Sequence, residues 1–99
     1  MAVVVFVRYS GGKRDALVPL AKKSKVIHEK AGAEWFRISQ IYTGPHAGQW
    51  LLSVRWPDWA TYGKGVQALA GDAALQKLIA EVATMTKLED RTIVVSVDL

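Results

Sequence analysis

The sequence predicts a small α+β domain with the element order strand, helix, strand, strand, helix, strand. Three observations predict it. Apolar residues recur at helical spacing over residues 14–31 and again over 59–85. Two runs, 34–43 and 49–56, have the alternation or apolar character of strands and are separated by a turn rich in glycine and proline, which predicts an antiparallel hairpin. Runs of β-branched residues near both ends of the chain supply the remaining two strands.

Length and composition limit the possibilities. Ninety-nine residues correspond to one domain, here residues 1–99, and an apolar fraction of 51% is slightly above that of typical globular chains. This excess favours apolar surface that a partner covers. The chain has no cysteine, so it can form neither a disulfide nor a thiolate metal site, and we expect a cytoplasmic protein. The first apolar run, residues 2–7, is too short for a signal peptide or a membrane span.

The first strand and the first helix follow from periodicity. Val3–Tyr9 has apolar residues on both faces, which is typical of a central strand covered on both sides. Residues 14–31 form one amphipathic helix. Pro19 is tolerated if the regular helix begins near Val18 and otherwise marks a kink, while Gly32 ends the helix.

The hairpin places different side chains on its two faces. With the turn centred near His46, the predicted register pairs Tyr42 with Trp50, Gln40 with Leu52, Ile38 with Val54 and Phe36 with Trp56. This face is almost wholly apolar. On the other face Arg37 would lie opposite Arg55, and like charges directly opposed are unfavourable, so this face should meet an anion or a carboxylate.

The second helical region is expected to be broken into two segments. Asp58 is a good N-cap for the first segment, and the dipeptide Gly71-Asp72 both stops it and caps the next. Gly63 and Gly65 weaken the first segment, which indicates that close packing or a ligand excludes a side chain there. The final strand is predicted at Thr92–Val97.

This order of elements is typical of the ferredoxin-like arrangement. It has a four-stranded antiparallel sheet with the first and third strands in the centre and both helices on one face. The other face stays bare, although the central strands carry apolar residues on it. We therefore expect a homodimer in which the bare faces of two sheets pack together about a two-fold axis.

The run GQWLLSVRWPDWATYGKGVQALAGD, taken with the element order, resembles the dimeric α+β barrel superfamily, in particular its antibiotic-biosynthesis-monooxygenase-like and NIPSNAP-like members. The resemblance covers essentially the whole chain. It implies a homodimeric barrel with a ligand cavity in each protomer between sheet and helices. Haem-degrading members carry a histidine ligand on the second helix, and this chain has none between Trp59 and Met85. Monooxygenase-like members use Asn, Trp and Tyr; this chain has Trp59 and Tyr62 but no Asn.

The candidate catalytic residues are His28, Tyr62 and Trp59. His28 lies on the apolar side of the first helix, where it is either a packed core histidine or a general base for a phenol or enol. His46 is expected in an exposed turn, and the spacing of the two histidines matches no metal site. The candidate ligand-binding residues, whose aromatic members could equally be core, are Phe36, Tyr42, Trp50, Trp56, Arg37 and Arg55.

Net charge is +4, and six of the thirteen basic residues lie between positions 13 and 30. They follow the polar side of the helix without interleaved aromatics, which favours a solvated face over nucleic-acid binding. The sequence therefore predicts a homodimer that binds a small, partly aromatic ligand and catalyses cofactor-independent oxygenation or isomerisation. No metal, cofactor, nucleic acid or membrane is expected as a partner. The alternative is a non-catalytic structural or interaction dimer.

Overall fold

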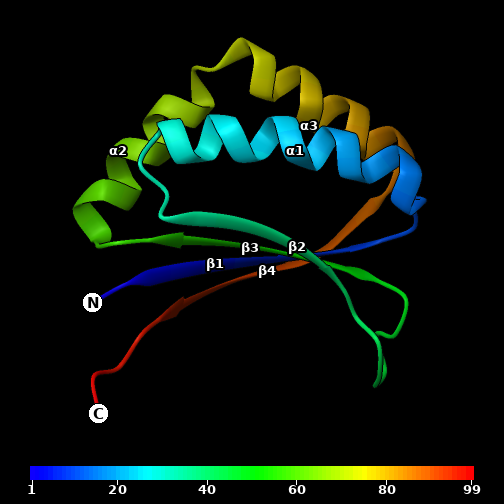
Figure 1. Cartoon of the computed structure of the whole chain (residues 1–99), viewed down its shortest axis with the longest axis horizontal. Helices are drawn as coiled ribbons and strands as arrows, with labels where there is room; N and C mark the ends of the chain where they lie inside the picture. Colours follow the sequence, from blue (N-terminus) through cyan, green and yellow to red (C-terminus); the bar gives the residue numbers. More distant parts are fainter.

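The computed structural model describes residues 1–99 and contains four strands and three helices. In chain order these are β1 (Val3–Ser10), α1 (Arg14–Lys30), β2 (Trp35–Gln40), β3 (Trp50–Trp56), α2 (Trp59–Ala70), α3 (Ala73–Met85) and β4 (Lys87–Val95). The strands form one antiparallel sheet in the order β2-β3-β1-β4. All three helices lie on the same side of it (Figure 1). The predicted ferredoxin-like α+β fold is confirmed.

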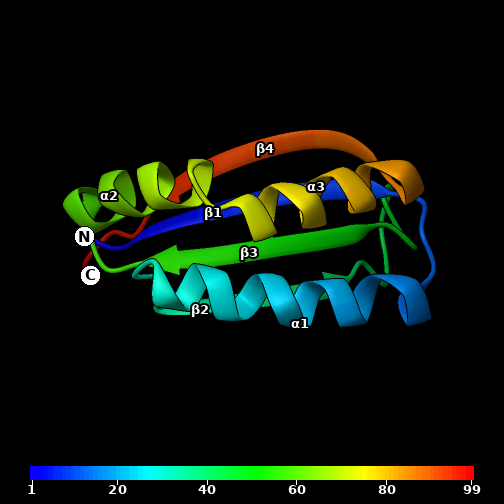
Figure 2. The same ribbon diagram turned by 90° about the horizontal axis from the view of Figure 1, so that it is seen from above.

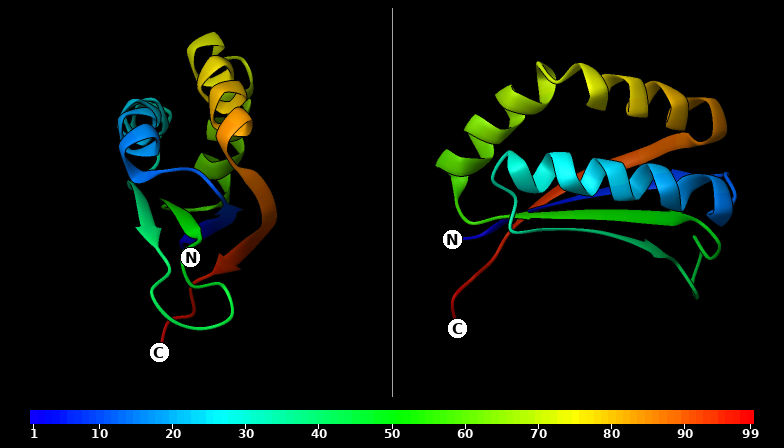
Figure 3. Two further views of the ribbon diagram at one scale, coloured as in Figure 1. Left: turned by 90° about the vertical axis from the view of Figure 1, so that its right-hand side faces the viewer. Right: turned by 45° about the horizontal axis from the view of Figure 1, so that its top comes forward.

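The helices form one layer over the sheet. Seen from above, α1 runs along the β2 side, while α2 and α3 follow the side of β1 and β4 (Figure 2). The other side of the sheet carries no helix, and only the loop between β2 and β3 and the C-terminal segment extend towards it (Figure 3). We call this side the open face, and its side chains alternate with those that face the helices: Val4, Phe6, Arg8, Trp35, Arg37, Ser39, Leu51, Ser53, Arg55, Asp90, Thr92 and Val94.

Helix α1 begins at Arg14, before Pro19, so a regular start near Val18 is wrong. The amide groups of Ala16 and Leu17 already donate to the carbonyl of Lys13, both at 3.0 Å. Pro19 removes a single helical hydrogen bond, and because it lies on an exposed side of the helix, water can reach the freed carbonyl.

The C-terminus of α1 is fixed by backbone hydrogen bonds. Gly32 has a positive φ of 115° and donates to the carbonyl of Glu29 at 3.1 Å. Ala33 donates to the carbonyl of His28, also at 3.1 Å, which completes a Schellman motif. Gly32 therefore ends the helix as predicted, and the motif fixes the backbone at His28.

The hairpin register differs by two residues from the prediction. Phe36 pairs with Val54 and Ile38 with Leu52, so Arg37 lies opposite Ser53 and Arg55 lies opposite Trp35. The predicted opposition of Arg37 and Arg55 is wrong. The cause is the turn: hydrogen bonds between Ile41 and Gln49 and between Gly48 and Ile41 leave residues 42–48 as a loop, which shifts its centre from His46 to Pro45. Because the shift is even, every side chain within β2 and β3 stays on its predicted face.

Strand β4 starts five residues earlier than predicted, at Lys87, and ends at Val95. Its first half is charged and pairs only with β1, as an edge strand in which alternation is weak. Two side-chain contacts hold it to β1: Arg8 pairs with Asp90 at 2.6 Å, and the Ser10 hydroxyl donates to Glu89 at 2.6 Å.

The core lies between the sheet and the helices, and Trp56 is its largest fully buried side chain. A Cβ atom on Gly65 would lie 2.2 Å from the Trp56 ring, so α2 approaches β3 closely only because residue 65 has no side chain. This confirms close packing as the reason for Gly65. Gly63 has no neighbour within 4 Å of its would-be Cβ, so the same explanation does not hold for it.

Candidate functional site

A cavity of about 540 Å³ separates the helices from the sheet. Of its 27 lining residues 22 are hydrophobic, so an occupant would be largely apolar. The lining includes no aspartate or glutamate. The five other lining residues are polar or charged: Ser24, His28, Gln76, Thr86 and Arg91. The hydroxyls of the lining tyrosines and the N–H groups of the lining tryptophans add further polar atoms.

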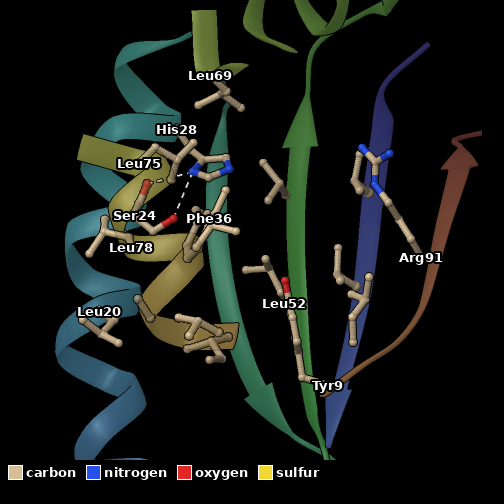
Figure 4. A pocket seen from close by; sticks show the side chains of 18 of the residues that line it. Tyr9, Leu20, Ser24, His28, Phe36, Leu52, Leu69, Leu75, Leu78 and Arg91 are labelled. Carbon is tan, nitrogen blue, oxygen red and sulfur yellow. Dashed lines mark hydrogen bonds between the residues drawn. The ribbon is translucent and has the colours of Figure 1, made fainter. Parts of the chain in front are cut away.

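His28 lines this cavity from the last turn of α1. Its Nδ1 lies 2.8 Å from the backbone carbonyl oxygen of Ser24, which can only accept, so Nδ1 carries the proton and donates. In the neutral ring Nε2 then keeps its lone pair. Figure 4 shows this second nitrogen pointing away from α1 towards the space over the sheet. The ring also packs against Phe36, with the two centroids 4.7 Å apart.

Burial lowers the pKa of His28 below its usual 6.5, and the hydrogen bond to Ser24 acts in the opposite direction. His28 is therefore neutral at pH 7. A neutral imidazole with one nitrogen anchored and the other facing an apolar cavity has the arrangement of a general base.

Tyr62 and Trp59 lie on α2 in an edge-to-face arrangement, with centroids 5.8 Å apart. Tyr62 lines the cavity and also meets Trp56 edge to face at 5.9 Å. Trp59 is 52% exposed and does not line the cavity. The structure thus brings Tyr62 to the cavity, while Trp59 reaches it only through Tyr62.

The candidate ligand-binding residues are divided between three places. Phe36, Trp50 and Trp56 line the cavity. Tyr42 is 92% exposed, because the loop of residues 42–48 takes it out of the strand, and it does not face Trp50 as the predicted register requires.

Arg37 and Arg55 lie on the open face, away from the cavity. The guanidinium carbon of Arg37 lies 4.0 Å from the Trp35 ring centroid. Arg55 Nε is 3.3 Å from Glu34, an ion pair without the orientation of a hydrogen bond. Neither arginine is in a position to bind a molecule held between sheet and helices.

Arg91 and Tyr9 are cavity residues that the sequence prediction missed. Arg91 pairs with Val7 across β1 and β4 and so shares the helix-facing side, where its Nη2 donates to the Tyr62 hydroxyl at 3.3 Å. Burial raises the pKa of Tyr9, while the positive charge of Arg91 acts to lower it. Strand parity would have placed Arg91 in the cavity had β4 been predicted from its true start.

His46 lies in the exposed loop outside the cavity, with its Nδ1 3.2 Å from Arg8 Nη1. No three histidine, cysteine, aspartate or glutamate side chains lie close enough together to hold a metal ion. None of the three helices has both the length and the apolar character needed to cross a membrane.

Comparison with known proteins gave matches among solved structures only. No family model matches the chain, and no curated protein matches it. A variant of SnoaB, a cofactor-independent oxygenase from Streptomyces nogalater, superposes with a TM-score of 0.75 at 10% identity, over 99% of this chain and 95% of that one. A dimeric ferredoxin-like protein from an uncultured marine organism gives 0.71 at 11% identity, over 98% of both chains.

A NIPSNAP family protein from Agrobacterium tumefaciens gives a TM-score of 0.69 at 14% identity, over 99% of this chain and 95% of that one. The chain shares the fold of these proteins. The resemblance to the dimeric α+β barrel superfamily is thereby confirmed at the level of fold. At such low identity a shared fold does not carry an activity from one protein to the other, so function must be argued from the cavity itself.

Proposed function

We propose that the protein is a homodimer that binds a small, partly aromatic molecule between sheet and helices and removes a proton from it. The observation that supports this most is the position of His28, whose Nε2 faces an apolar cavity of about 540 Å³. A phenol or enol placed there would give its proton to Nε2, and the Ser24 carbonyl would stabilise the imidazolium by accepting from Nδ1.

The anion left after proton removal has two cofactor-independent outcomes. It can be reprotonated on carbon, which is an isomerisation, or it can transfer electrons to molecular oxygen, which begins an oxygenation. Tyr62 lines the same cavity, and its hydroxyl can donate to an oxygen of the bound molecule. Trp59 packs against the Tyr62 ring and would position it. SnoaB, a structural neighbour, is itself a cofactor-independent oxygenase.

The homodimer is supported by the open face. Its central strands present Val4, Phe6 and Leu51, and Val94 on the edge strand is 41% exposed. These apolar side chains lie among arginines and other polar residues, and apolar patches of this kind mark interaction surfaces. A second copy can cover it symmetrically, and one structural neighbour is a dimeric ferredoxin-like protein.

Replacing His28 by alanine is expected to abolish turnover. The test measures oxygen uptake with naphthohydroquinone, which transfers two hydrogen atoms to oxygen and gives naphthoquinone and hydrogen peroxide. The wild type should exceed the rate in buffer, and His28→Ala should lose roughly a hundredfold or more of that excess. His46→Ala is the matched control, because His46 lies outside the cavity, and should keep it. An unchanged excess in His28→Ala would rule out His28 as the base.

The same excess rate should depend on pH with a single acid limb. The base must be unprotonated, and burial lowers the pKa of His28 below 6.5. The excess rate should therefore fall along one acid limb centred below pH 6.5 and level off at higher pH. If the excess rate over buffer instead rises along a limb centred above pH 7, the base is a group other than His28.

A non-catalytic binding dimer is the second candidate. The observation in its favour is that the cavity lining holds one histidine and no carboxylate that could act as a separate acid. Saturable binding of an aromatic probe together with no oxygen uptake and no isomerisation would decide for this function.

A further inference from the structure

Arg91 is a cation beside a cavity that contains no acid. No carboxylate oxygen lies within 4.0 Å of its guanidinium group, since the ion pairs of the chain are Arg8 with Asp90 and Arg55 with Glu34. The two acidic residues that precede it in sequence are engaged elsewhere: Asp90 with Arg8 on the open face, and Glu89 with Ser10. Its only side-chain partner is the neutral hydroxyl of Tyr62.

Arg91 is exposed to solvent, so water hydrates its charge, and it borders the cavity with most of its donors unused within the protein. Its five donors have the geometry that pairs with a carboxylate or a phosphate. The remaining lining is neutral or apolar. The one unbalanced charge therefore favours a ligand with a single negative charge, and the planar guanidinium group suits a planar carboxylate.

We propose that the cavity binds an apolar molecule bearing one carboxylate, with the carboxylate at Arg91 and the body extending towards His28. This inference rests on the proposed function and names the chemical class of its ligand. Arg91 comes from the edge strand β4 and His28 from α1, which packs over the opposite edge of the sheet, so the two side chains lie on opposite sides of the apolar lining (Figure 4).

The two polar ends also give the ligand a direction. Besides Arg91, the hydroxyl of Tyr62 can donate to the carboxylate, since Tyr62 accepts from Arg91 and keeps its own proton free. Nε2 of His28 then meets the far end of the molecule. The reacting hydroxyl or enol should therefore lie at the end opposite to the carboxylate.

The test compares two probes by calorimetric titration. One is a hydroxynaphthoic acid with its two groups at opposite ends of the ring system, and the other is its neutral analogue with a hydroxymethyl group in place of the carboxylate. The wild type should bind the acid more tightly. Arg91→Gln should weaken binding of the acid roughly tenfold or more, as expected for a lost charge-assisted contact, and leave the neutral analogue unchanged.

Two further variants make the result specific. Arg37→Gln removes an arginine that also lacks a carboxylate partner but lies on the open face, outside the cavity. The affinity of this variant for the acid should therefore equal that of the wild type. Arg91→Lys keeps the charge and should retain part of the preference for the acid, which separates a charge effect from a folding defect.

The outcomes distinguish this inference from the function on which it rests. Equal affinity of the wild type for both probes, or an equal loss for both in Arg91→Gln, would overturn the carboxylate site and leave ligand binding in place. Failure of the wild type to bind either probe would overturn both proposals.

Discussion

Replacing Gly65 by alanine is expected to lower the free energy of unfolding by about 1–3 kcal/mol, the usual cost of overpacking a core. The new methyl group would lie 2.2 Å from the Trp56 ring, and this indole is only 2% exposed, so it has no free space into which it can move. Helix α2 must then shift away from β3. Chemical denaturation of both proteins measures the difference.

Gly63→Ala is the matched control on the same helix. Nothing lies within 4 Å of its would-be Cβ, and its backbone is helical, so alanine should raise stability by about 0.5–1 kcal/mol through helix propensity. Opposite signs for the two substitutions would establish contact with Trp56 as the cause. A loss of stability in both would instead point to an effect of the helix as a whole.

Replacing Phe6 by glutamate is expected to convert the proposed homodimer to a monomer. Phe6 lies on the open face of the central strand β1, so a dimer through this face would bury one unpaired carboxylate from each protomer. An unpaired buried charge costs roughly 3 kcal/mol or more, which weakens association by more than about a hundredfold. Sedimentation equilibrium should give twice the protomer mass of 10.9 kDa for the wild type and the protomer mass for the variant.

Val26→Glu makes the same chemical change on another surface. Val26 is 65% exposed on α1, remote from the open face, and its substitution should leave the dimer intact. A wild type that sediments as a protomer at micromolar concentration would overturn the homodimer. A Phe6→Glu protein that still sediments at twice the protomer mass would place the interface on another surface.

The sequence predicts the fold well because patterning decides which way side chains face. Alternation assigned Phe36, Trp50 and Trp56 to the helix-facing side, and they line the cavity despite the wrong register. A register shift of two residues leaves the side chains of β2 and β3 on the faces that alternation predicts. The position of the loop between them depends instead on hydrogen bonds such as that between Gly48 and Ile41, and these leave no periodic pattern in the sequence. Tyr42 was misplaced for that reason.

The candidate site is predicted less completely because its one arginine, Arg91, lies on an edge strand. The start of β4 is charged, and its pairing with β1 alone removes the need for regular alternation. The sequence pattern therefore places Arg91 before the predicted strand and not within it. His28 was found because a histidine on an apolar helix stripe is conspicuous, but the tautomer follows only from its contact with the Ser24 carbonyl.

The contact between Trp56 and Gly65 also has a consequence for the ligand. The indole of Trp56 touches α2 at Gly65 and also lines the cavity. Because this ring is rigid, it sets the distance between α2 and β3. Aliphatic side chains can change rotamer to admit a larger guest, whereas an indole wedged against a backbone cannot. The end of the cavity beneath α2 therefore has a fixed height. This end should accept planar ligands and exclude ligands that are thicker than an aromatic ring.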